Sequence, residues 1–261
     1  MGVNCSLHFK KGLDFLSKKT PILYRFIKWF VWALYPKFKV EGLEKLPADA
    51  TIIVGNHSQT NGPVFSELHL PINHQTWCRG EMMHLKETPS YMFKDFWGQK
   101  SRFTQPIYKA FAYLISPLAA FIFKHANTIA VYNDSRVMTT FKASVRYLTE
   151  GESIVIFPEH DVKYNNIIYD FQDNFIDLAR LYCKKTGKAL SFTPLYIARN
   201  LKTAYIGEPI YYSAESDKDT ERARIKQYLM DNITSLAKSA PEHTVVPYRN
   251  IKKSTYPKNT D

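Results

Sequence analysis

The pattern of apolar and polar residues after residue 36 predicts an α/β fold. Short runs rich in apolar and β-branched residues, which we expect to be strands, lie at 37–40, 51–54, 76–79, 128–132, 153–157 and 190–197. Helical patterns separate or follow them at 63–70, 136–149, 171–185 and 217–238. This alternation is typical of a mostly parallel central sheet flanked by helices. In such sheets ligands bind beyond the carboxyl ends of the strands, so we look for chemistry there.

An amphipathic amino-terminal helix is predicted ahead of the sheet, at residues 21–36. Its apolar residues recur at helical spacing and form one stripe: Ile22, Phe26, Ile27, Phe30, Val31 and Leu34. A helix packed on the core and a helix at a membrane surface both give this pattern. The nearby Trp29, Trp32, Arg25 and Lys28 favour the membrane surface. We therefore expect a membrane-surface helical segment at 1–36, an α/β domain at 37–248 and a frayed polar tail at 249–261.

A second apolar stretch, at residues 110–123, lies between Lys109 and Lys124. It is shorter than the ~20 residues that a helix needs to cross a bilayer, and Pro117 interrupts it. We expect a buried helix here and no transmembrane span in the chain. The protein is therefore predicted to be peripheral or monotopic on the cytoplasmic side of a membrane.

The charge of the chain narrows the set of partners. Lys and Arg number 35 against 24 Asp and Glu, which leaves a net charge of +11. Nucleic acid, anionic lipid and phosphorylated substrates are the partners that such a charge favours. The basic residues are spread along the chain without a recognisable RNA-binding motif, which argues against nucleic acid. An anionic membrane surface is the partner that we expect.

The three cysteines are Cys5, Cys78 and Cys183, and they lie far apart. Their spacing supports neither a disulfide framework nor a zinc site, so we predict no metal and a reducing compartment. The segment 1–6, MGVNCS, fits the short pattern for myristoylation of Gly2.

Two predicted strand ends carry residues with chemical potential. The strand at 51–54 runs into GNHSQ, which contains His57, and the strand at 153–157 runs into PEHD, which contains Glu159. A histidine titrates near neutral pH and can act as a general base. A carboxylate that projects from the sheet edge can bind a hydroxylated substrate. A turn-capping histidine and a Glu–Arg ion pair are the alternatives.

Together the two strand ends resemble the glycerolipid acyltransferase family, which includes the bacterial lysophosphatidate acyltransferases. The resemblance runs from about residue 37 to 212. Asn56 and His57 match the start of the family's Asn-His-x4-Asp block, and FPE at 157–159 matches the start of its Phe-Pro-Glu-Gly-Thr block. The helix at 171–185 with Gly187, and FTPLYI at 192–197, resemble the region around the family's apolar strand. An amphipathic helix ahead of these blocks is also common in the family.

The resemblance implies an acyltransferase-like domain that moves an acyl group from an acyl thioester to a lipid hydroxyl. The thioester would be acyl-CoA or acyl carrier protein, and no further cofactor is expected. His57 would be the base and would return the proton to the departing thiolate. The helix at 110–123 could then form a wall for the acyl chain. The substrate-binding residues that follow from the resemblance are Asn56, Arg136, Pro158, Glu159 and His160.

The sequence departs from the family at the residue that orients the histidine. The family places Asp where this chain has Gly62, and loss of an orienting Asp costs about 10⁴ in rate in a serine-protease triad. Asn61, Glu67 and Asp161 are the possible replacements, and Glu67 is slightly favoured because it restores a charge. The alternative is a non-catalytic lipid-binding relative on the same scaffold.

A second departure concerns the cation that contacts the acceptor's phosphate in the family. The family has an arginine directly after the strand at 128–132, whereas Arg136 comes three residues later here. It is expected near a helix start, and helix amino termini attract anions. Arg79 is a further candidate cation, with a surface ion pair as its alternative role.

Overall fold

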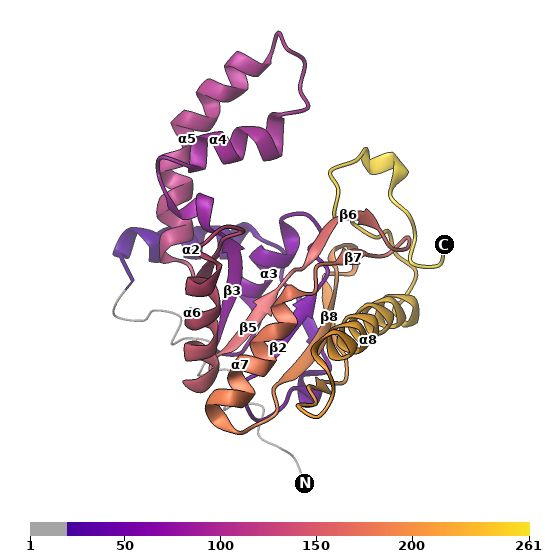
Figure 1. Ribbon diagram of the computed structural model, residues 1–261. Helices are drawn as coiled ribbons and strands as arrows, with labels where there is room; N and C mark the ends of the chain where they lie inside the picture. Colours follow the sequence, from indigo (N-terminus) through magenta and orange to yellow (C-terminus); the bar gives the residue numbers. More distant parts are fainter. Residues whose placement is uncertain (1–19) are drawn as a thin grey trace. The chain divides into compact units, whose positions relative to one another are not determined.

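The computed structural model describes residues 20–261 of the chain (Figure 1). The chain forms two compact units. The first unit contains residues 20–35 and 77–140, and the second contains residues 36–76 and 141–261. The myristoylation pattern and Cys5 lie outside the described residues.

The second unit is built on a mostly parallel sheet. The strand order is β1 (Lys39–Glu41), β9 (Thr203–Ile206), β8 (Ser191–Ala198), β2 (Ile52–Gly55), β5 (Ser153–Ile156) and β3 (His74–Arg79). The last three residues of β3 belong to the first unit, as does β4 (Thr128–Val131). The pairs β1–β9, β8–β2, β2–β5 and β5–β3 are parallel, whereas β8 pairs antiparallel with β9 and with β10 (Ile210–Tyr211). Six of these strands were predicted, and the α/β fold class is confirmed.

Alternation along the central strands builds the core of the second unit. Ile53 of β2, Val155 of β5 and Leu195 of β8 are fully buried in one cluster with Phe65. Phe65 comes from α3 (Asn61–His69), so α3 covers that face of the sheet. Successive side chains of a strand point to opposite faces. On the other face lie α7 (Asp177–Thr186) and α8 (Lys218–Ser239), as Figure 1 shows.

Several elements were missed because they are short and weakly patterned. β9 and β10 add to the sheet after β8, and a separate antiparallel hairpin forms from β6 (Glu159–Lys163) and β7 (Tyr169–Phe171). The predicted helix at 171–185 therefore starts late, at Asp177, because residue 171 still belongs to β7. It ends at Thr186 and is capped by Gly187, whose φ of 71° is a left-handed conformation that favours glycine.

The first unit is mainly helical. It contains α2 (Ile22–Leu34), α4 (Thr88–Met92), a π-helical turn (Phe93–Trp97), α5 (Gln105–His125) and the start of α6 (Val137–Thr149). Met82, Met92 and Ala112 form its buried cluster. The small residues Ala112, Ser116 and Ala120 line the buried face of α5.

The expectation of a short, buried helix at 110–123 was wrong. α5 is 21 residues long and continues past Pro117, which lies inside it. By length and composition it could cross a membrane. Its large apolar residues are mostly exposed: Ile107 is 70% exposed, Leu114 76% and Leu118 53%. α2 has the predicted amphipathic pattern, and it too exposes large residues, among them Phe26, Trp29 and Phe30.

The expectation of a frayed tail at 249–261 was also wrong. Residues 245–258, hereafter the C-terminal strap, leave the end of α8 and return to it. The backbone N–H of Val245 donates to the carbonyl of Pro257 at 2.8 Å, and Thr244 pairs with Lys258. Asn259 is fully buried, and its side-chain nitrogen donates to the carbonyl of Ala237 at 2.8 Å, so it caps the end of α8.

Candidate functional site

His57 lies on a tight turn at the carboxyl end of β2. The next two residues, Ser58 and Gln59, have φ values of 47° and 55°, in the left-handed region that non-glycine residues seldom adopt. Such strain persists only where the surrounding structure enforces it, and it concentrates at functional sites. The turn therefore has a feature expected of an active site, at the strand end where the sequence predicted one.

Glu159 holds this turn from the neighbouring strand end. The side chain is only 5% exposed, and its two oxygens accept backbone N–H groups of His57 at 2.5 Å and Tyr169 at 2.7 Å. Burial raises the pKa of Glu159 to about 7, and the two N–H donors offset part of that effect. Both oxygens bind backbone in this structure, so the expected contact of Glu159 with a substrate stays a prediction.

The imidazole of His57 is packed between aromatic rings. The rings of Phe157 and Tyr248 meet it edge to face, with centroids 5.6 and 5.7 Å away. Burial lowers the pKa of His57, which favours the neutral imidazole that a general base requires. Its Nδ1 is buried and has no hydrogen-bond partner among residues 20–261.

The space beside Gly62 explains why this position carries no carboxylate. A Cβ added there would lie 2.7 Å from the Phe157 ring and 2.8 Å from the His57 carbonyl oxygen. The N–H of Gly62 also donates to that carbonyl at 3.0 Å, which fixes the backbone. An aspartate at residue 62 cannot fit without movement of the turn.

The three predicted replacements for the missing aspartate do not orient His57 in this structure. The amide oxygen of Asn61 accepts from Arg199 Nε at 2.9 Å. Asp161 is exposed and pairs with Arg249 at 2.8 Å. Glu67 is half-buried within α3. Because Nδ1 has no partner within the described residues, neither Glu67 nor Asp161 makes the expected hydrogen bond to it.

Asn56 and Pro158, predicted to bind substrate, are buried structural residues. The Asn56 side chain accepts the N–H of Ile197 at 2.7 Å and donates to its carbonyl at 3.3 Å, which extends the pairing of β2 with β8. The carbonyl of Pro158 accepts the N–H of Gln172 at 3.0 Å. Both residues shape the strand ends through these contacts. Their predicted contacts with substrate stay predictions.

His160 forms an ion-pair cluster beside the site. Its Nε2 lies 2.9 Å from Asp170, whose other oxygen lies 2.7 Å from Lys226 Nζ. Burial opposes ionisation of Asp170, but hydrogen bonds from Lys226 and His160 hold its pKa below the usual range. Nothing in the structure supports the prediction that His160 binds substrate, because His160 on β6 pairs with Asp170 on β7.

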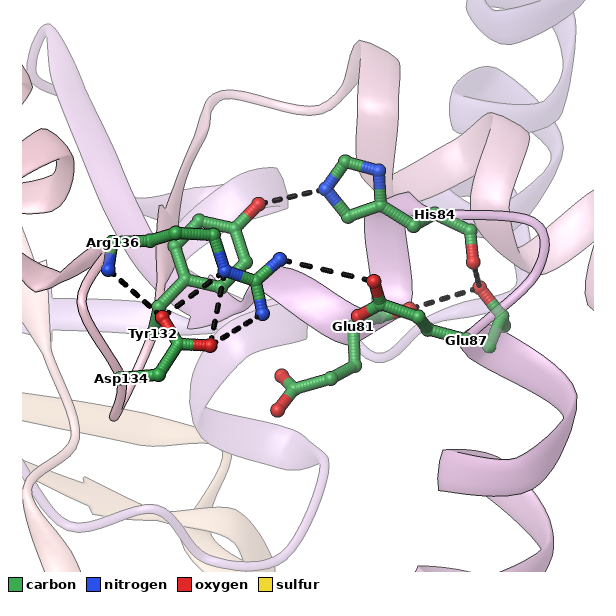
Figure 2. A network of polar contacts seen from close by, with 7 residues as sticks. Glu81, His84, Glu87, Tyr132, Asp134 and Arg136 are labelled. Atoms are coloured by element: carbon green, nitrogen blue, oxygen red, sulfur yellow. Dashed lines mark hydrogen bonds and ion pairs between the residues drawn. The ribbon is translucent and has the colours of Figure 1, made fainter.

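Arg136 belongs to the first unit, where it is already engaged (Figure 2). Its guanidinium forms a fork on Asp134, with Nη2 2.7 Å from the carboxylate, and it lies 3.7 Å from Glu87. It also stacks on the Tyr132 ring at 3.9 Å, while the Tyr132 hydroxyl bonds His84 at 2.7 Å. The guanidinium that was predicted to bind phosphate is therefore already paired with two carboxylates.

Part of the site comes from the C-terminal strap, for which no sequence pattern was recognised. The Gln59 side chain donates to the Tyr256 hydroxyl at 2.8 Å, and Tyr248 lies between the rings of His57 and Tyr169. A cavity of about 500 Å³ lies between the β6–β7 hairpin and the strap, and its lining includes Lys163, Tyr169 and Tyr256. Within residues 20–261, no group of three or more His, Cys, Asp or Glu side chains is arranged to hold a metal ion.

No family model matches the chain, and no curated protein matches its sequence. The crystal structure of the 1-acyl-sn-glycerophosphate acyltransferase PlsC from Thermotoga maritima is similar over 88% of each chain, with 13% sequence identity and a TM-score of 0.44.

Proposed function

We propose that this protein is an acyltransferase that moves a fatty acyl group from an acyl thioester to a hydroxyl of a lipid acceptor, such as a lysophospholipid. The observation that carries the proposal is His57 itself. A half-buried histidine with a lowered pKa lies at the carboxyl end of β2, on a strained turn that Glu159 clamps. The motif blocks around His57 and Phe157 point to the same chemistry.

His57 acts as the general base in this proposal. The neutral imidazole takes the proton of the acceptor hydroxyl while the hydroxyl oxygen bonds to the thioester carbonyl carbon. The tetrahedral intermediate collapses, the carbon–sulfur bond breaks, and the imidazolium returns the proton to the thiolate. Such acid–base catalysis contributes about 10²–10⁴ in rate. Acyl-CoA or acyl carrier protein supplies the acyl group, and the polar cavity beside the C-terminal strap is a site for the acceptor's head group.

The first unit supplies the membrane contact in this proposal. Ile107, Leu114 and Leu118 recur on one exposed side of α5, and Phe103 ahead of it is 93% exposed. Exposed apolar surface of this extent marks an interaction site. Lys94, Lys100, Arg102 and Lys109 flank it, and cations attract anionic lipid. In this proposal α5 lies flat at the membrane surface, with its exposed apolar side in the lipid and these cations at the head groups.

One experiment tests the reaction directly. His57→Gln should abolish transfer from labelled acyl-CoA or acyl carrier protein to lysophosphatidate in mixed micelles. His84→Gln is the matched control, because His84 is bonded to Tyr132 in the first unit and should be dispensable. Unchanged product formation by folded His57→Gln protein would refute the proposal.

A second candidate is a non-catalytic lipid-binding protein on the same scaffold. It is favoured by the absence of a carboxylate on Nδ1 within the described residues and by the filled space at Gly62. Vesicle binding by the wild-type protein with no product from any donor and acceptor would support this candidate over the enzyme.

A further inference from the structure

We propose that the C-terminal strap completes the His57 site, with Tyr248 as a positioning residue that holds the imidazole where a carboxylate would otherwise orient it. The inference rests on the proposed function in that His57 is taken as the reacting group. Tyr248 itself would hold the ring through packing and would take no part in proton transfer.

The strap is fixed at both ends, which restricts where its middle can lie. Val245 and Pro257 are joined by a backbone hydrogen bond. Directly after the strap, Asn259 accepts the His243 N–H at 2.9 Å and donates to three carbonyls near the end of α8. Figure 1 shows the strap, in yellow, rising from α8 beside the β6–β7 hairpin. A segment with anchored ends loses less entropy when its central side chains are ordered.

The middle of the strap contacts the strained turn directly. Gln59, one of the two left-handed residues, donates to the Tyr256 hydroxyl at 2.8 Å and to the Arg249 carbonyl at 3.4 Å. Arg249 Nε lies 2.8 Å from Asp161 on β6. These contacts join the strap to the two strand ends that form the site.

Tyr248 is the strap residue that reaches the imidazole. The Tyr248 ring lies at 86° to the His57 ring, and the Phe157 ring lies at 71° to the same His57 ring. Two edge-to-face neighbours restrict rotation of the imidazole, and they exclude water from it. Tyr169 packs on Tyr248 with a centroid distance of 5.6 Å, which adds a second aromatic contact to that ring. Aromatic packing thus replaces the hydrogen bond that Nδ1 lacks within residues 20–261.

The test compares Tyr248→Leu, Tyr248→Phe and Tyr211→Leu. Leucine keeps apolar bulk but loses the aromatic edge, whereas phenylalanine keeps the ring. Tyr211 is 53% exposed on β10 and is the matched control. We measure the pKa of His57 by NMR titration of its ring proton, assigned with His57→Gln, together with kcat and KM for acyl transfer.

We expect Tyr248→Leu to admit water and raise the pKa of His57 toward its ordinary value. Its kcat should fall about 10- to 100-fold, as loss of catalytic alignment does, with a smaller change in KM. Tyr248→Phe should restore the wild-type pKa and most of kcat. The ionisable groups around the turn, Glu159 on β6, Tyr169 on β7 and the Asp161–Arg249 pair, are the same in all variants.

Two results would overturn the inference: a His57 pKa and kcat in Tyr248→Leu equal to the wild type, or equal losses in the Leu and Phe variants. Asn259→Ala provides a second route if Tyr248→Leu does not fold, because it loosens the strap at its anchor. The His57 pKa should rise in that variant also, and an unchanged value would count against the inference. The NMR readout needs no substrate, so a shifted pKa in a protein without transferase activity would refute the proposed function and support the strap's role.

Discussion

Glu159 makes the stability of this protein depend on pH in a direction opposite to that of most carboxylates. Burial raises its pKa from the ordinary 4.5 to about 7. Between these values the folded protein holds a proton that the unfolded chain has released. Stability from this group is therefore complete below pH 4.5 and is lost as the pH rises through 7. The loss amounts to about 3 kcal/mol, at ~1.4 kcal/mol per pKa unit.

The perturbation that isolates this effect is Glu159→Gln. Glutamine has one oxygen for the N–H groups of His57 and Tyr169, and its NH₂ group faces the other N–H. Leaving one buried donor unpaired costs about 1–3 kcal/mol at every pH. The variant should therefore be much less stable than the wild type at pH 5, and the difference should shrink as the pH rises toward 8.

The measurement is urea unfolding followed by far-ultraviolet circular dichroism across that pH range. Tryptophan fluorescence is unsuitable, since all four tryptophans belong to the first unit and Glu159 belongs to the second. Glu221→Gln is the control. Glu221 is also buried, but hydrogen bonding to Arg224 lowers its pKa, so its contribution changes only below pH 4.5. Stability curves of Glu159→Gln and wild type that run parallel from pH 5 to 8 would refute the reasoning.

Three further predictions concern single substitutions outside Glu159. Gly62→Asp restores the family's carboxylate, but its Cβ would meet the His57 carbonyl oxygen. The variant should therefore lose about 1–3 kcal/mol in the free energy of unfolding and gain no transferase activity. A variant that is as stable as the wild type and faster in the transfer assay would contradict this. Asn259→Ala should lower the free energy of unfolding by about 1–3 kcal/mol in the same urea assay, whereas the exposed neighbour Thr260→Ala should not, and equal effects would count against the anchor. Leu114→Asp should weaken binding to phosphatidylglycerol-containing vesicles about 10-fold or more in a flotation assay, with unchanged binding as the contrary result.

Local patterns in the sequence were enough to identify the elements that build the sheet. The runs at 51–54, 153–157 and 190–197 are mostly apolar, as is typical of strands in a sheet that is covered on both faces. The same reasoning placed His57 and Glu159 at two strand ends on the edge where such sheets bind ligands. The pairing of β2 with β5 in the structure makes these two ends neighbours. The short β6, β7, β9 and β10 could not be found, since their few residues carry no clear period.

Tertiary structure alone decided how the residues of the site are used. Whether Glu159 faces a substrate or a backbone amide depends on the path of β7, and whether residue 62 has room for a carboxylate depends on where the Phe157 ring packs. The strap reaches the turn from about 190 residues away in sequence, and no local signal encodes such a contact. The sequence by itself determined six strands of the sheet and the place of His57 at the end of one of them, because both follow from local periodicity. Only long-range packing determined that aromatic rings, and not an acid, surround that histidine.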